Sequence, residues 1–211
     1  MECCDANGLD RLFRGAPVRR EAREFARRGP NRRQRAFFEG LEPTGRRVLD
    51  LGCGVGALGL TALGRGAADA TFVDVSRDYL RTARELADRF ELTPRSSFLL
   101  GDALALELPE AELVMLDRVV CCHPAGPALL TKAARLSGEA LLFSYPRASW
   151  YLRLGRAMGN ALMRLWRHPY RFYLHDERAL SAAAESVGHR LVAARRFGVW
   201  QLCHYRKGSE G

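Results

Sequence analysis

VLDLGCGVG, residues 48–56, is the stretch that decides the fold of this chain. A largely aliphatic run leads into three glycines at alternate positions, Gly52, Gly54 and Gly56, and a helical pattern follows them. Such a run is typical of a buried strand, and glycine lets the backbone approach a ligand where a Cβ atom would collide. The stretch therefore predicts a strand, a tight loop and a helix that together bind a ligand.

Short apolar runs alternate with helical patterns from Arg47 onward. This rhythm predicts βαβ units that build a parallel sheet with helices on both faces. Strands are expected at residues 47–52, 70–74, 96–100, 112–117 and 139–145, with helices that begin near Gly56, Ser76 and Pro124. The predicted fold class is therefore α/β, with a doubly wound sheet.

The rhythm changes after Tyr145. Residues 146–169 indicate one long helix and a break, residues 176–188 indicate another helix, and residues 189–197 and 199–207 indicate two strands. Only a short turn around Gly198 separates these two strands. They are expected to pair antiparallel, because a parallel return needs a crossover of about a dozen residues or more.

A single domain over residues 1–211 is expected, since a chain of 211 residues can bury its own core. The predicted parts are a helical cap (1–45) that breaks at Gly29-Pro30, a cofactor-binding core (46–145), a lid helix (146–170), and a closing helix with a hairpin (171–211).

The 48–56 stretch resembles the DxGxGxG signature of class I S-adenosylmethionine-dependent methyltransferases. The resemblance extends over about residues 47–145 and the closing hairpin. It implies a Rossmann-like sheet of seven strands, mostly parallel with an antiparallel C-terminal hairpin, and S-adenosylmethionine as the cofactor. The expected cofactor-binding residues are Asp50, Gly52, Cys53, Gly54, Gly56, Asp74, Val75, Asp102, Ala103, Asp117 and Arg118.

Three acids have distinct roles in that resemblance. The family places an acid such as Asp50 where it organises the ammonium end of the ligand, beside the glycine loop that holds the methionine part. Asp74, at the end of the next strand, is expected to accept hydrogen bonds from the ribose hydroxyls. Asp102 matches the acidic position that receives the adenine amino group.

A dinucleotide site is the alternative for the same loop, because Gly54-x-Gly56-x-x-Gly59 satisfies the fingerprint GxGxxG. That match is weak on its own. The acid at position 50 favours the methyltransferase, since nicotinamide sites typically have an apolar residue there. The tetrapeptides NPPY and DPPY, with which amino-directed adenine and glutamine methyltransferases grip their nitrogen, do not occur in the sequence.

Catalysis of methyl transfer depends mainly on positioning, and a general base is optional when the nucleophile is already anionic. His123 is the candidate base, because imidazole titrates near neutrality. Tyr145 is expected to orient the acceptor, and Arg147 to hold its carboxylate or phosphate. The segments DRVVCCHP (117–124) and FSYPR (143–147) resemble the magnesium-protoporphyrin methyltransferase branch, whose product is a methyl ester of a propionate.

The formal net charge of +9 is uneven, because arginines gather in residues 18–35. Such a run attracts anions or forms a solvated helix face, and by itself does not make a nucleic-acid binder. No apolar stretch approaches the roughly 18 residues of a membrane span, and residues 1–15 carry no signal-peptide core, so a cytoplasmic location is expected. The cysteine spacing predicts reduced thiols and no metal site.

The helix after the fifth strand is amphipathic and basic. Its apolar stripe contains Trp150, Leu154, Met158, Ala161 and Leu165, and a second stripe is rich in arginine. Three roles stay open: a surface helix packed on the core, a lid over a flat, acidic and hydrophobic acceptor, and a contact with a membrane surface.

The expected function is O-methylation of a small anionic or aromatic acceptor, with nitrogen, sulfur and metalloid acceptors open. The charge leaves an RNA methyltransferase as an alternative, although nucleic acid is not the expected partner. The pairs Cys3/Cys4 and Cys121/Cys122 raise the hypothesis of a soft-metal or trivalent arsenic substrate. A non-catalytic cofactor-binding scaffold is the alternative from another class.

Overall fold

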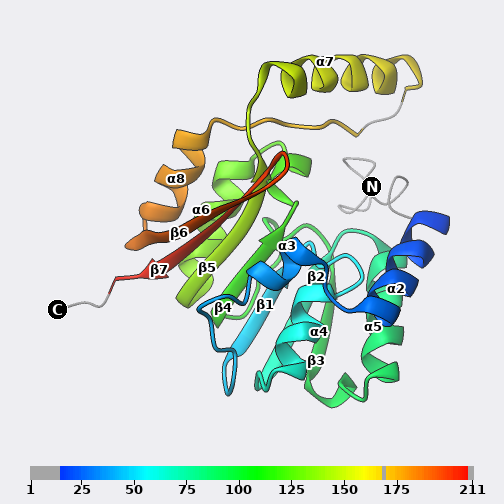
Figure 1. Cartoon of the computed structure of the whole chain (residues 1–211), viewed down its shortest axis with the longest axis vertical. Coiled ribbons are helices and arrows are strands. Elements are labelled where there is room, and N and C mark those ends of the chain that lie inside the picture. Colours follow the sequence, from blue (N-terminus) through cyan, green and yellow to red (C-terminus); the bar gives the residue numbers. More distant parts are fainter. Residues whose placement is uncertain (1–14, 168–169, 209–211) are drawn as a thin grey trace.

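A single seven-stranded sheet organises the protein, in the order β3-β2-β1-β4-β5-β7-β6 (Figure 1). The computed structural model describes residues 15–167 and 170–208. Strands β1 to β5 run parallel, and β7 lies antiparallel between β5 and β6. This confirms the predicted α/β fold and its antiparallel C-terminal hairpin. The strands are β1 (Arg47–Leu51), β2 (Asp69–Asp74), β3 (Ser96–Leu100), β4 (Ala111–Asp117), β5 (Ser137–Pro146), β6 (His189–Phe197) and β7 (Trp200–Lys207).

The helices begin close to where the sequence places them. Gly56 and Ser76 are N-cap residues, and the Ser76 side chain accepts a hydrogen bond from the Tyr79 backbone N–H. The described helices are α2 (Ala16–Arg28), α3 (Arg32–Ala36), α4 (Ala57–Gly64), α5 (Arg77–Arg89), α6 (Gly126–Leu136), α7 (Trp150–Leu165) and α8 (Glu177–Glu185), with 3₁₀ turns η2 (Thr93–Arg95) and η3 (Val120–Cys122).

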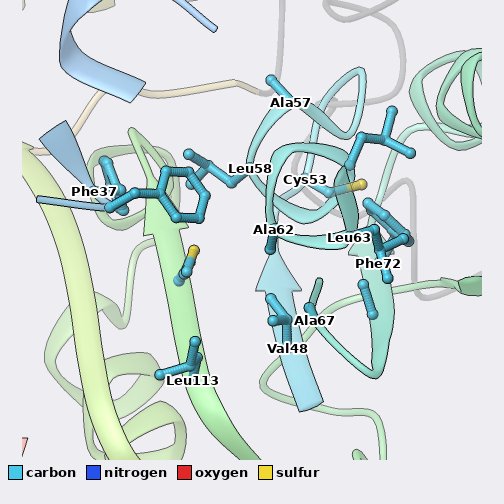
Figure 2. Close-up of a cluster of buried hydrophobic side chains, with 14 of the residues drawn as sticks. Phe37, Val48, Cys53, Ala57, Leu58, Ala62, Leu63, Ala67, Phe72 and Leu113 are labelled. Carbon is cyan, nitrogen blue, oxygen red and sulfur yellow. The ribbon is translucent and has the colours of Figure 1, made fainter. Parts of the chain in front are cut away.

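Alternation along the strands divides the core between the two faces of the sheet. Leu113 and Met115 of β4 belong to a cluster with α2, α3, α4 and α5, and Figure 2 shows Phe37, directly after α3, beside Leu58 of α4 in this cluster. The intervening residues of β4 belong to a second cluster, with α6 and α8. Both faces are therefore covered, as a parallel sheet requires.

The topology fixes where a ligand binds. From β1 the chain builds β2 and β3 on one side, and then returns to build β4 and β5 on the other. Between β1 and β4 the connections diverge to opposite sides, which opens a crevice at the carboxyl ends of the strands. The loop that contains Gly52 and Gly54 lies at this crevice.

Helix α7, the predicted lid helix, lies apart from the rest of the helical layers. In Figure 1 it runs above the sheet, separated from α4 and α5. None of its side chains is buried, and Trp150 of the apolar stripe is 77% exposed. No α7 residue is among those that line the cavity at the carboxyl ends of the strands. None of the helices in the described part of the chain has the length and hydropathy that a membrane crossing requires.

Gly59→Ala is expected to lower the free energy of unfolding by about 1–3 kcal/mol through overpacking. A Cβ at this position of α4 would lie 2.3 Å from Cε1 of Phe72. Phe72 cannot yield, because it is fully buried and stacks on Phe98 with a centroid separation of 5.0 Å.

Gly64→Ala is the matched control in the same helix, since its Cβ would meet no atom within 4 Å. We expect unchanged or higher stability for this variant, because alanine favours helix. Urea unfolding compares the two variants. Equal stability of both would contradict the close packing of α4 on β2.

Candidate functional site

A cavity of about 310 Å³ lies at the carboxyl ends of β1, β2, β3 and β4, a size within the usual range for small-molecule sites. Its lining brings together most of the residues that the sequence predicts: Asp50, Gly52, Cys53, Gly54, Asp74, Val75, Asp102, Ala103, Asp117, Arg118 and His123. Gly56 is not among the lining residues; it is the N-cap of α4, with φ of 79°.

The glycine loop is held against β2 by its backbone. The N–H groups of Gly52 and Cys53 both donate to the Val73 carbonyl oxygen, at 2.7 and 3.0 Å. Gly52 has φ of 64°, and a Cβ there would lie 2.4 Å from Cγ2 of Val119. Any other residue would therefore be strained and would collide with the wall of the cavity.

Two carboxylates are buried next to this loop. Asp50 is 2% exposed, and its Oδ2 accepts a hydrogen bond from the Gly59 N–H at 2.9 Å. Asp74 accepts from the Gly54 N–H at 2.9 Å and from the Ser76 N–H at 2.8 Å. Burial raises the pKa of Asp50 to about 7 and that of Asp74 to about 6, against the opposing effect of the backbone donors.

A third carboxylate, Asp102, is positioned by His123. His123 Nδ1 accepts a hydrogen bond from the Ala125 N–H at 3.1 Å, so the proton of the neutral ring is assigned to Nε2, which donates to Asp102 Oδ2 at 3.3 Å. The hydrogen bond from His123 lowers the pKa of Asp102. Both ring nitrogens are therefore engaged within the protein, and the role of His123 as a general base stays a prediction.

Asp117, the last residue of β4, links this strand to β5 and to the N-terminal cap by hydrogen bonds. It accepts two hydrogen bonds from the Arg33 guanidinium, both at 2.8 Å, and one from the Ser144 hydroxyl at 2.6 Å. The Ser144 oxygen in turn accepts from the Arg118 N–H at 2.9 Å. This network holds Arg118 at φ of 64°, a backbone conformation that costs energy for any residue other than glycine.

The Arg118 side chain lines the cavity. It lies 6.0 Å from the centroid of the Trp200 ring, and Arg33 lies 5.7 Å from the same ring. Glu21 is 3.6 Å from the Arg118 guanidinium and accepts a hydrogen bond from the Tyr79 hydroxyl at 2.9 Å. This end of the cavity therefore combines a cation with aromatic surface.

Two adjacent thiols lie at the same end. The sulfur atoms of Cys121 and Cys122 are 3.9 Å apart, and Cys122 Sγ is 3.5 Å from the Tyr170 hydroxyl. Hydrogen bonding from Cys121 and Tyr170 lowers the pKa of the Cys122 thiol. Cys3 and Cys4 lie outside the described residues.

Tyr145 and Arg147 are not among the residues that line this cavity. They line a separate hollow with Glu177, and Arg147 Nε lies 3.7 Å from a Glu177 carboxylate oxygen. The reason is the two-residue period of β5: Tyr145 packs in the cluster beside α8, while Ser144 bonds to Asp117 on the cavity wall. The structure therefore separates both residues from His123.

Several lining residues escaped the sequence analysis. Glu21 lines the cavity, and Arg33 binds the lining residue Asp117; both belong to the arginine-rich cap, where nothing in the sequence distinguishes them from solvated charges. Phe172 and Trp200 reach the cavity from segments more than fifty residues beyond Arg118. Ser144 does not line the cavity but bonds to the lining residue Asp117, and the alternation of β5 could have indicated this side of the strand.

The side chains that line the cavity suit an organic ligand better than a metal ion. Within residues 15–167 and 170–208, no three His, Cys, Asp or Glu side chains form a group that could hold a metal ion. Asp50, Asp74 and Asp102 offer acceptors along one cavity, so a ligand that presents hydrogen-bond donors at several points would match them.

Comparison with known proteins identifies the central segment. Residues 48–137 match a family model described as a methyltransferase domain. The ribosomal protein L11 methyltransferase of Chromohalobacter salexigens is 31% identical over 114 residues, which are 50% of this chain and 38% of that protein. The corresponding protein of Salmonella newport is 34% identical over 93 residues, 43% of this chain and 29% of its own length. The matches thus span about a third of these curated relatives.

Solved structures share the whole fold. Magnesium protoporphyrin IX methyltransferase of Synechocystis PCC 6803, with bound SAH, has a TM-score of 0.71 at 18% identity, over 95% of this chain and 98% of that one. An O-methyltransferase family protein of Burkholderia thailandensis has a TM-score of 0.68 at 19% identity, over 98% of this chain and 64% of that one. The [4+2]-cyclase SpnF has a TM-score of 0.63 at 16% identity, over 83% of this chain and 80% of that one, so the fold alone does not fix the chemistry.

Asp50→Asn is expected to raise the free energy of unfolding of the ligand-free protein relative to wild type, and to do so more at pH 8 than at pH 4. The folded pKa of Asp50, about 7, lies above the ordinary value of 3.8. The folded state therefore binds the proton more tightly, and the Asp50 contribution to stability falls as the pH rises from about 4 to 7. Asparagine does not titrate, so the variant avoids this loss of stability, which is on the order of a few kcal/mol.

Urea unfolding of wild type and variant at both pH values measures the effect. The variant's advantage should grow with pH. An advantage of the same size at pH 4 and pH 8 would show that Asp50 is not a titrating buried acid.

Proposed function

We propose that this chain, whose residues 48–137 match a family model described as a methyltransferase domain, transfers the methyl group of S-adenosylmethionine to an oxygen atom of a small anionic or aromatic acceptor. One observation carries the proposal: Asp50, Asp74 and Asp102, from three neighbouring strands, line one cavity. S-adenosylmethionine presents donors in its ammonium group, its ribose hydroxyls and its adenine amino group. The three carboxylates therefore match the three donor groups of the cofactor.

Charge favours this cofactor over a dinucleotide. The ammonium and sulfonium groups of S-adenosylmethionine are positive, and each compensates a carboxylate that burial leaves poorly solvated. A dinucleotide would bring its negative pyrophosphate to the glycine loop, between Asp50 and Asp74. That arrangement costs energy, because like charges at short range repel strongly in a partly buried site.

The residues of this chain bind and orient the cofactor. Asp74 has its oxygens fixed by the Gly54 and Ser76 N–H groups, so it offers its remaining lone pairs in one direction. His123 fixes Asp102 in the same way. Bound cofactor supplies an electrophilic methyl group, and this positioning supplies the main rate acceleration.

The other end of the cavity supports an anionic acceptor. Arg118 offers a guanidinium that matches a carboxylate, and Trp200 and Phe172 offer aromatic surface. A carboxylate is already ionised at neutral pH and needs no base, which agrees with the engagement of both His123 nitrogens. Similarity to the magnesium protoporphyrin IX methyltransferase and O-methyltransferase family folds favours an oxygen acceptor.

The vicinal thiols favour a second candidate, a trivalent metalloid acceptor. Cys121 and Cys122 line the cavity with their sulfur atoms 3.9 Å apart, and soft thiolate ligands suit such a substrate. Transfer of a labelled methyl group to arsenite would distinguish it from the carboxylate acceptor.

Asp74→Ala is expected to weaken S-adenosylhomocysteine binding by about ten- to a hundred-fold, because a charged hydrogen-bond partner of this kind contributes about 1.5–3 kcal/mol. Calorimetry measures the affinity. Asp69→Ala is the matched control at the other, exposed end of β2 and should bind as wild type does. Tight NADH binding without S-adenosylhomocysteine binding would overturn the assignment of the cofactor.

Arg118→Gly separates a role in binding from a role in folding. Glycine adopts φ of 64° without strain, so stability should stay constant or rise by about 1 kcal/mol. The variant should retain S-adenosylhomocysteine binding, yet lose about ten- to a hundred-fold in methyl transfer to anionic acceptors, since the charged partner is gone.

Transfer of labelled methyl groups into the small-molecule, protein and RNA fractions of a cell extract is the measurement. Label in the RNA or protein fraction would contradict the small-molecule proposal. Wild-type transfer by Arg118→Gly would remove Arg118 from the acceptor site.

A further inference from the structure

Helix α7 presents its most apolar face to solvent. Trp150, Leu154, Met158 and Leu165 fall on one side of the helix and are 77%, 53%, 65% and 76% exposed. Soluble proteins rarely expose a contiguous patch of such large side chains unless it contacts a partner.

The orientation of the helix is fixed by hydrogen bonds. Asn160, outside the apolar face and within the arginine-rich stripe, accepts a hydrogen bond from the Phe172 N–H at 2.9 Å and donates one to the Phe172 carbonyl at 3.0 Å. Leu152 and Met163, half-buried, lie on the Asn160 side. The contacts with the rest of the protein therefore hold the apolar face outward.

The chemistry around this face matches the surface of an anionic bilayer. Residues 147–167 contain no Asp or Glu, and Arg153 and Arg164 lie beside the apolar side chains. Trp150 and Trp166 stand at the two ends of the helix, and tryptophan favours the membrane–water interface. Such an arrangement of apolar face, flanking arginines and terminal aromatics is typical of helices that lie in the plane of that interface.

We propose that α7 docks the protein on the surface of membranes that contain anionic lipids, with its apolar face inserted among the headgroups. The flanking arginines attract the negative surface of the bilayer. A second copy of the chain fits less well, because two α7 helices would bring their arginine rows together without acidic partners. The docking surface is separate from the cofactor end of the cavity, so this proposal does not depend on the identity of the cofactor.

Vesicle flotation of the full-length chain tests the proposal, with phosphatidylcholine vesicles and with vesicles that also contain phosphatidylglycerol. The wild-type chain should float with the mixed vesicles, bind weakly to phosphatidylcholine alone, and dissociate at high salt. The double variant Trp150→Ala/Leu154→Ala should bind at least about ten-fold more weakly, since it removes two large apolar side chains that would insert among the headgroups.

Leu191→Ala/Val192→Ala is the matched control, because these side chains of β6 are 47% and 53% exposed but lie outside α7. It should bind vesicles as wild type does. All four side chains are exposed, so thermal unfolding should stay near the wild-type value. Equal vesicle binding by the two double variants would overturn the proposal. Failure of wild type to bind mixed vesicles would do the same, as would concentration-dependent dimerisation in solution that Trp150→Ala/Leu154→Ala abolishes.

Discussion

A buried carboxylate that is held by backbone N–H groups is the interaction on which the rest of this structure depends. Asp74 joins the glycine loop after β1 to the start of α5 through Gly54 and Ser76, and Asp50 joins β1 to α4 through Gly59. These bonds align the loop, two strands and two helices at the crevice. Desolvation makes the carboxylates costly, as their raised pKa values indicate. A cationic ligand with several donors relieves that cost, so the same interaction that positions the site also selects what it binds.

Local patterns in the sequence predicted the fold and the cofactor end of the cavity. The glycine loop, the apolar strands and the short turn at Gly198 are each decided by residues close in the chain, and they led to the parallel sheet with its antiparallel hairpin. Asp74 and Asp102 could be placed because parallel strands end at one edge of the sheet. Residues 48–137 match a family model described as a methyltransferase domain, in agreement with the resemblance that this pattern carries.

The acceptor end could not be predicted, because its residues meet only in the folded chain. Arg33 looked like one more arginine of a solvated run, yet it binds Asp117 through two hydrogen bonds. Tyr145, expected to orient the acceptor, packs beside α8, and its neighbour Ser144 is the β5 residue that bonds to Asp117. Helix α7 was expected to close the cavity with its apolar stripe. Its polar contact is Asn160, and the apolar face points outward instead.

Hydrogen exchange of the backbone amides, with and without S-adenosylhomocysteine, tests the central claim most directly. If the cofactor binds between the three carboxylates, residues 51–57, 74–76 and 101–103 should exchange more slowly in its presence, while residues 145–147 and α7 should not change. NADH at the same concentration should leave all of these segments unaffected. Protection confined to residues 145–147, or protection of the glycine loop by NADH but not by S-adenosylhomocysteine, would contradict the account.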